Sequence, residues 1–203
     1  MRTSLLRPYL YLYSQQSLTL LGEATCWEDL RNPAASAGPG ATNPVYAQFR
    51  RNAGNTSAGV YAQRFADPGA GAEGMDLMFD VQHSHAMKTG SIISPHIHWS
   101  PNDANAGDVG WGIEYTEANI YGVFPVTTSE LVAVAASGVQ YSHDLAEFSD
   151  IVNANRTISG MMKFRVYRSD VGNIDTYAAV VWLHEFDVHY EIDTIGSRQE
   201  YIK

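Results

Sequence analysis

Four of the seven histidines lie close together in the sequence: His83, His85, His96 and His98. On a β-strand, His96 and His98 project from the same face, about 7 Å apart at roughly 3.3 Å of rise per residue. Two imidazoles at that spacing can hold a metal ion, and His184 is the candidate third ligand. The alternative interpretation is that His96 and His98 face solvent or a subunit interface. His184 is then a core histidine satisfied by one hydrogen bond.

The spacing before these histidines partly resembles the first motif of the cupin family. Gly90 is followed by five residues and then by His96 and His98. The family has a glutamate shortly after its histidines, where this chain has Asn102 and Asp103 in a turn-rich segment. Its second motif, with Pro-x-Gly and a third histidine, is not found. The resemblance implies one alternative function, a cupin-like metal-binding protein or enzyme that uses His96 and His98.

The segment 182–192 alternates strictly and predicts a long strand with an aromatic core face that includes Trp182, His184 and Phe186. Its other face and the residue that follows it carry four carboxylates: Glu185, Asp187, Glu191 and Asp193. A pair of carboxylates two residues apart can divide acid and base roles. Like charges on a strand face are more often solvated, or paired with cations on a neighbouring strand. We expect the second arrangement, with Lys163 and Arg165 as partners.

Motifs of catalysis are missing from this sequence. It contains no nucleophile elbow, phosphate-binding loop, dinucleotide fingerprint or zinc-protease helix motif. The single cysteine, Cys26, lies between Thr25 and Trp27, which favours packing over reactivity. We therefore predict a non-enzymatic protein with no catalytic residues, no cofactor-binding residues and no cofactor.

Alternating apolar residues predict an all-β fold, an antiparallel β-sandwich or jelly roll. A repeated Val-Tyr-Ala-Gln at 45–48 and 60–63, separated by turn residues, predicts a hairpin. Further strands are expected at 75–81, 93–99, 111–116, 130–135, 139–143, 161–168 and 182–192. One short helix is expected within 144–153, because Leu145, Phe148 and Ile151 or Val152 share a helical face.

The first 44 residues differ in composition from the remainder. The segment 32–44 is rich in Gly, Ala and Pro and predicts an extended N-terminal arm over 1–44, followed by the β-domain over 45–203. The apolar, tyrosine-rich segment 5–13 fits either an anchor into another chain or an edge strand of its own sheet. We expect residues 196–203 to be fixed by a contact within the chain or between subunits.

Charge and hydropathy exclude several classes of partner. The net charge of −9 and a pI of about 5.1, without a basic cluster, argue against nucleic acid. The apolar runs are much shorter than the roughly 20 residues that span a bilayer, so no membrane partner is expected.

Three segments resemble a family of tailed-bacteriophage virion proteins. They are Ser-Pro-His-Ile-His-Trp at 94–99, the stretch 107–125 with its Trp-x-x-Glu-Tyr and a following Ala-Asn, and the stretch 185–203 ending Gly-Ser-Arg-Gln-Glu-Tyr-Ile-Lys. The segments occur in the same order in that family. The resemblance covers roughly residues 25–203 and is most specific in the C-terminal half.

The resemblance implies a structural protein of the virion, assembled in the host cytoplasm as a homo-oligomer. A capsid cement or decoration protein in contact with the major capsid protein is the first expectation. A neck, tail or fibre-attachment component is the second. A carbohydrate-binding sandwich using an exposed aromatic side chain, such as Tyr115 or Tyr121, is a further alternative.

Overall fold

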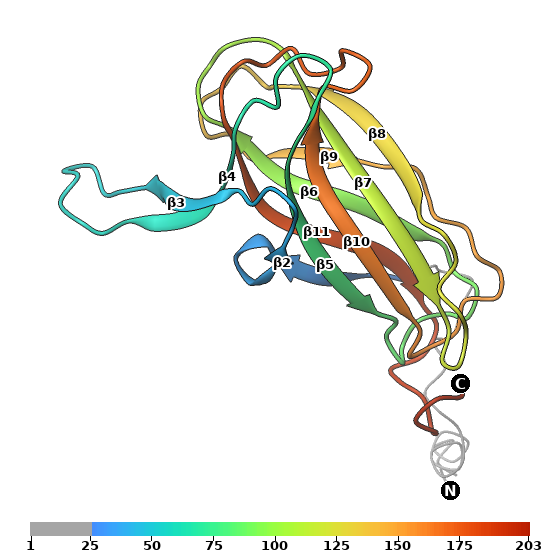
Figure 1. Cartoon of the computed structure of the whole chain (residues 1–203). Coiled ribbons are helices and arrows are strands. Elements are labelled where there is room, and N and C mark those ends of the chain that lie inside the picture. Colours follow the sequence, from blue (N-terminus) through green and yellow to red (C-terminus); the bar gives the residue numbers. More distant parts are fainter. Residues whose placement is uncertain (1–25) are drawn as a thin grey trace, which may run out of the picture.

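The computed structural model describes residues 26–203, which form two antiparallel sheets packed face to face (Figure 1). The strands are β1 Cys26–Pro33, β2 Gly38–Pro39, β3 Val45–Arg50, β4 Val60–Phe65, β5 Glu73–Gln82, β6 Ile93–Pro101, β7 Asp108–Ala118, β8 Thr128–Ala135, β9 Asp144–Glu147, β10 Met161–Ser169 and β11 Val181–Ile192, and the 3-10 turn η1 spans Ala34–Ser36. Sheet I has the order β3-β4-β11-β6-β9, with β1 also paired to β11. Sheet II has the order β2-β5-β10-β7-β8. The predicted all-β sandwich is confirmed.

Aromatic residues on the inner faces of both sheets form the core. Trp99 of β6 lies 6.3 Å from Trp111 of β7, centroid to centroid, and both are fully buried. Phe186 of β11 contacts Phe164 of β10 and Phe79 of β5, at 4.8 and 5.3 Å. These contacts join sheet I to sheet II and keep the outer face of each sheet available for other roles. No helix among the described residues has the length and apolarity to cross a membrane.

The hairpin predicted from the repeated Val-Tyr-Ala-Gln is confirmed. Strands β3 and β4 pair antiparallel, with Ala47 opposite Ala62. Figure 1 shows this hairpin projecting away from the body of the sandwich.

The short helix expected within 144–153 is wrong. Residues 144–147 form β9, which pairs antiparallel with β6. Leu145 is exposed whereas Ala146 and Phe148 are buried, so the segment alternates as a strand does. The edge of β6 supplies backbone partners, and these override the weak helical pattern.

The arm predicted over 1–44 differs from the structure from residue 26 onward. Strand β1 pairs with β11 along all eight of its residues, Ala34 is buried, and Gly38 and Pro39 pair with β5. The segment therefore crosses from sheet I to sheet II instead of extending away. Pairing of β1 with the long strand β11 satisfies backbone groups that an extended arm would otherwise leave to water. The segment 5–13 lies outside the described residues.

The alternation predicted for 182–192 is interrupted by a β-bulge. The pairing of β11 with β6 shifts between Leu183, opposite Trp99, and Glu185, opposite His98. Val181 and Leu183 face the core before the bulge, and Phe186, Val188 and Tyr190 face it afterwards. His184 and Glu185 therefore share the outer face, because an extra residue reverses the phase of the alternation. The prediction that Trp182 and His184 lie on the core face is wrong.

Residues 196–203 pack against their own chain. His85 Nδ1 lies 2.7 Å from Ser197 Oγ, and Ser159 Oγ donates a 3.3 Å hydrogen bond to the Glu200 carbonyl. Lys203 Nζ donates to the Ala86 carbonyl at 3.1 Å. The expected fixation of this segment is thus intramolecular.

Candidate functional site

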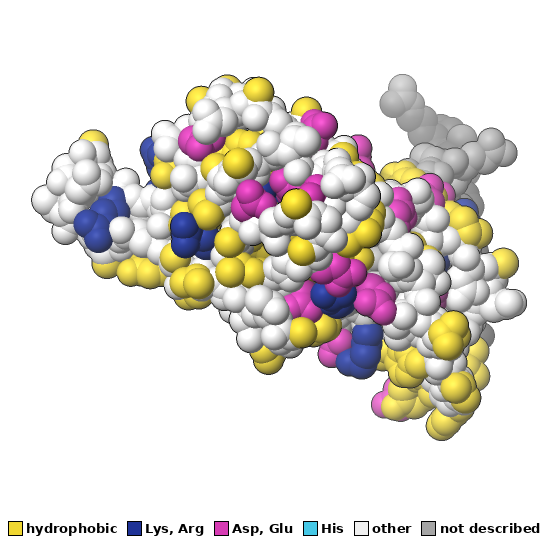
Figure 2. All heavy atoms as spheres, turned by 45° about the horizontal axis from the view of Figure 1, so that its top comes forward, with side chains coloured by type: hydrophobic (Ala, Val, Ile, Leu, Met, Phe, Trp, Pro, Cys, Tyr) yellow, Lys and Arg dark blue, Asp and Glu magenta, His cyan; other side chains and the backbone are white. Residues whose placement is uncertain are grey.

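Five of the seven histidines gather on the outer face of sheet I, which we call the histidine face: His96, His98, His143, His184 and His189. The His96 ring lies 5.0 Å from the His98 ring and 4.2 Å from the His189 ring, centroid to centroid. The His98 ring stacks 4.9 Å from that of His143. The face of the molecule drawn in Figure 2 shows acidic and basic side chains interspersed, and no histidine.

Strand register places a carboxylate at the centre of the histidine face. On β11, Asp187 lies opposite His96 of β6 on one side and Arg31 of β1 on the other. One pair along, Glu185 lies opposite His98, and in the other direction His189 lies opposite Asp29. Side chains directly opposite each other on one face are about 5 Å apart at Cβ, so this register brings them into contact.

Asp187 is in contact with both histidines of β6. Its Oδ1 lies 2.7 Å from His96 Nε2 and 3.4 Å from His98 Nε2. The residue is 3% exposed, and Oδ1 is buried without accepting an aligned hydrogen bond. One nitrogen of each histidine and one oxygen of Asp187 lie within 4.8 Å of one another. This is a group of three side chains able to hold a metal ion.

The two histidines differ electrostatically. Burial lowers the pKa of His96, but contact with Asp187 and with the Ser94 carbonyl outweighs that effect, so the pKa of His96 is raised from its ordinary value. Burial lowers the pKa of His98 despite the charge of Asp187, with His96 and His143 contributing in the same direction. The pair thus combines an imidazole that favours its proton with one that favours the neutral form.

The charged groups around this centre are already paired. Arg31 holds Glu185 through two contacts of 2.8 Å, from Nε and from Nη2. His189 Nε2 lies 2.9 Å from Asp29 Oδ1. A hollow of about 440 Å³ reaches the centre from one side and is lined by Asp29, Arg31, His98, His143, His184, Glu185 and Asp187. The site is therefore open to solvent on that side while Asp187 stays buried.

The predicted third ligand, His184, occupies a different position from that expected. It lies on the histidine face, but its Nε2 contacts Ser100 Oγ at 2.8 Å and its ring packs 4.8 Å from that of Phe49. Burial, together with the neighbouring His143 and His98, lowers the pKa of His184 to about 4. The structure thus brings His96 and His98 together as predicted and puts Asp187 where a third ligand was sought.

Sequence reasoning missed Asp187, His143 and His189 as members of the site. Asp187 and His189 are two residues apart on β11, as His96 and His98 are on β6, and that shared spacing was the available signal. The four carboxylates at 185, 187, 191 and 193 do not pair with Lys163 and Arg165 as predicted. Those cations lie on β10 of sheet II, where Lys163 contacts Asp80 and Arg165 contacts Asp76 and Glu73.

The remaining two histidines lie apart from this face. His83 is buried, and its Nδ1 lies 2.9 Å from the Thr157 carbonyl. Burial is the main reason that the pKa of His83 is lowered. His85 contacts Ser159 and Ser197. Both have local structural partners, so the four-histidine group of the sequence divides into two unrelated pairs.

Comparison with known proteins gives no family for this chain. No family model matches it, and no curated protein matches it. Among solved structures it resembles a cycloisomaltooligosaccharide glucanotransferase of Paenibacillus sp., at 15% identity and a TM-score of 0.43 over 77% of this chain and 17% of that one. It also resembles the insecticidal delta-endotoxin Cry8Ea1 of Bacillus thuringiensis, at 10% identity and 0.40 over 80% and 24%. TmCBM61, solved with β-1,4-galactotriose, aligns at 12% identity and 0.33 over 81% and 88%.

Proposed function

We propose that this chain is a non-enzymatic structural protein of a tailed-bacteriophage virion. Within the virion we propose a capsid cement or decoration role, in which a homo-oligomer stabilises the head through contacts with the major capsid protein. The observation that carries the proposal is the set of three segments that resemble such virion proteins, together with their arrangement in the fold.

Strands from all three segments are adjacent in space, although the third segment follows the second only after residues 126–184. The segment 94–99 lies in β6 and pairs with the start of the segment 185–203 in β11. The segment 107–125 includes β7, whose Trp111 packs on Trp99 of β6 across the core. The strand portions of the three segments therefore lie next to one another within the sandwich, which is what a shared fold would preserve.

The projecting hairpin offers a surface suited to subunit contacts. Four of its large apolar residues are about half exposed: Val45, Tyr46, Val60 and Tyr61. The rings of Tyr46 and Tyr61 lie 5.7 Å apart and form a small aromatic pair on the hairpin. Exposed apolar side chains grouped on a protruding element are typical of protein interaction sites.

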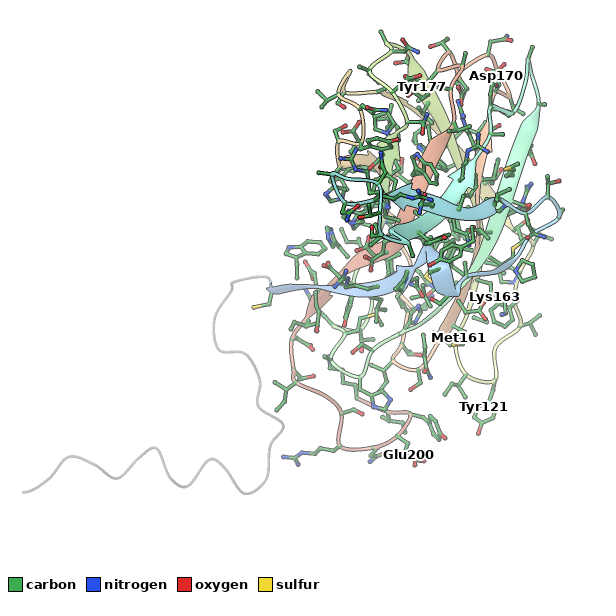
Figure 3. All side chains as sticks on the ribbon, turned by 90° about the vertical axis from the view of Figure 1, so that its left-hand side faces the viewer. Tyr121, Met161, Lys163, Asp170, Tyr177 and Glu200 are labelled. Atoms are coloured by element: carbon green, nitrogen blue, oxygen red, sulfur yellow. The ribbon has the colours of Figure 1, made fainter. Side chains whose placement is uncertain are left out.

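One end of the sandwich carries a second apolar surface, which we call the apolar end: Tyr121, Val123, Phe124, Val126, Tyr201 and Ile202. Tyr121 is fully exposed, and Val123 and Val126 are each at least 90% exposed. Tyr121, Tyr201 and Ile202 line one shallow hollow. Figure 3 places Tyr121 and Glu200 at the same end of the molecule, and Figure 2 shows yellow side chains gathered at the lower right. A second contact surface of this kind favours assembly over a solitary monomer.

A neck, tail or fibre-attachment position is the second candidate, because the same resemblance supports it equally. Reconstruction of intact particles of the phage that encodes this chain separates the two. Density for the sandwich at local symmetry axes of the capsid is expected for a cement protein. Density confined to the tail vertex would replace that role with the second candidate. A protein absent from purified particles by mass spectrometry would overturn the virion proposal itself.

A further inference from the structure

We propose that His96 Nε2, His98 Nε2 and Asp187 Oδ1 bind one divalent first-row transition-metal ion, for which Zn²⁺ is the probe. The proposal is independent of the virion role, because it rests only on the geometry of β6 and β11. Imidazole nitrogens and a carboxylate oxygen are the ligands that Zn²⁺ and its neighbours in the series accept.

The buried carboxylate of Asp187 is the first argument. A charged group removed from water requires an opposite charge and hydrogen bonds to offset the loss of solvation. Asp187 Oδ1 accepts no aligned hydrogen bond, although the residue is 3% exposed. Its cross-strand neighbour Arg31 is engaged with Glu185 by two 2.8 Å contacts. The remaining close contact is His96 Nε2 at 2.7 Å, and a metal ion held between Asp187 and the two histidines would supply a stronger countercharge than that contact alone.

The orientation of the imidazole rings is the second argument. His96 Nδ1 faces the Ser94 carbonyl at 3.4 Å, and a carbonyl only accepts, so Nδ1 carries the hydrogen. His98 Nδ1 faces His143 Nε2 at 2.6 Å and can donate to it. In these tautomers Nε2 of each ring carries no hydrogen, and it lies 2.7 Å (His96) or 3.4 Å (His98) from Asp187 Oδ1. Three electron-pair donors this close to one another repel unless a proton or a metal ion lies among them.

The same contacts supply what metal-binding histidines usually have. The ring nitrogen that does not bind the metal donates to a carbonyl or another acceptor, which fixes the tautomer and the ring orientation. Here the Ser94 carbonyl holds His96 in this way, and His143 holds His98. His143 is thus a positioning residue in this proposal.

The distances are close to those of a bound ion. In a tetrahedral site with bonds of 2.0–2.1 Å, ligand atoms lie about 3.3 Å apart. The two measured N···O distances are 2.7 and 3.4 Å, and all three ligand atoms lie within 4.8 Å. Small side-chain rotations would bring the three ligand atoms to that spacing. The paired strands β6 and β11 hold the backbone of all three residues in place. His98 and Asp187 also line the hollow beside His143 and His184, so a fourth ligand could enter from there.

The test is zinc binding by the full-length, tag-free protein, measured by isothermal titration calorimetry and by elemental analysis. We expect one Zn²⁺ per chain. Asp187→Asn and His98→Gln should each weaken binding by at least about 100-fold, since loss of an outer-shell partner alone costs 10–100-fold. The matched control is His189→Gln, which removes a histidine 4.2 Å from His96 that is not a ligand. Its affinity should stay within about threefold.

Cobalt substitution keeps the proposal testable where a variant fails to fold. Co²⁺ bound to the unaltered protein should give the visible absorption of a tetrahedral site, and Zn²⁺ should displace it. The proposal is overturned if the folded protein binds neither ion stoichiometrically. It is equally overturned if His189→Gln abolishes binding while Asp187→Asn and His98→Gln retain it. Zinc, iron or manganese found in protein from unsupplemented medium would identify the resident ion.

Discussion

Asp187 of β11 and His96 of β6 stand directly opposite each other, with Oδ1 and Nε2 separated by 2.7 Å in a buried setting. Neither residue's neighbours in sequence suggest this contact. It results from the register of two strands that are about ninety residues apart in the chain.

Saturating Zn²⁺ should stabilise the protein against unfolding by binding to His96, His98 and Asp187. A ligand at about 100 times its dissociation constant adds about 2.7 kcal/mol to the free energy of unfolding. We expect that gain in the unaltered protein and in His189→Gln, and its loss in Asp187→Asn. Differential scanning fluorimetry with and without chelator measures the corresponding shift in the unfolding temperature. An equal shift in Asp187→Asn would assign the zinc effect to some other site.

The stability of metal-free protein should fall in mild acid because of His184. Its pKa is lowered to about 4 by burial and by the neighbouring His143 and His98. The hollow that it lines also contains Glu185, Asp187, Asp29 and Arg31. Because the folded pKa lies below the ordinary 6.5, the unfolded chain takes up the proton first as pH falls, and stability is lost between about pH 6.5 and 4.

The lowered pKa of His184 sets the size of this loss in the free energy of unfolding, at about 1.36 kcal/mol per pKa unit. Because the side chain is partly exposed to solvent, we expect a loss of roughly 1–2 kcal/mol. His184→Gln should remove that part of the pH dependence. Urea unfolding in chelator at several pH values gives the dependence of the free energy of unfolding on pH for the unaltered protein and for His184→Gln. Parallel slopes for the variant and the unaltered protein would show that His184 does not carry the effect.

Removal of the Arg168 guanidinium should be among the most damaging single changes in sheet II. Its side chain is fully buried and holds Asp175 at 2.6 and 2.9 Å, while Nη1 donates to the Ala179 carbonyl at 2.7 Å. Asp175 and Ala179 belong to the segment 170–180 that connects β10 to β11. Figure 3 shows Asp170 and Tyr177 of this segment at one end of the sandwich. Arg168→Met would leave a buried carboxylate unpaired, at a cost of about 3–5 kcal/mol.

Lys163 on the same strand is the matched control for Arg168. It pairs with Asp80 at 2.8 Å, but both side chains are more than half exposed. Lys163→Met should change the free energy of unfolding by less than about 1 kcal/mol. Similar losses for Arg168→Met and Lys163→Met in chemical denaturation would contradict the assigned role of the buried pair.

Truncation of the aromatic pair on the hairpin should separate folding from assembly. Tyr46 and Tyr61 are each about half exposed and make little contact with the core. The double variant Tyr46→Ser/Tyr61→Ser should unfold within about 1 kcal/mol of the unaltered protein. We expect its oligomer to dissociate at least tenfold more readily in sedimentation velocity, since exposed aromatics often dominate interfaces. An unchanged oligomer would exclude the hairpin as the subunit contact.

The local alternation of apolar and polar residues predicts much of the fold. Leu77, Phe79 and Val81 on β5, and Ile97 and Trp99 on β6, enter the core as the period of two predicts. The same alternation puts His96 and His98 on one outer face. The repeated Val-Tyr-Ala-Gln and the turn residues between its copies determine the hairpin. These features depend on neighbours within about ten residues, so a single sequence suffices to predict them.

What only the tertiary structure decided depends on pairing between distant strands. The bulge at Leu183–Glu185 turns His184 outward, and the register of β11 with β6 puts Asp187, rather than His184, between the two histidines. Pairing with β11 also draws residues 26–33 out of the predicted arm. A shift of one residue exchanges the two faces of a strand, and that choice is made by the packing of both sheets together. The sequence therefore determined which side chains share a strand face, and the fold determined which of them meet.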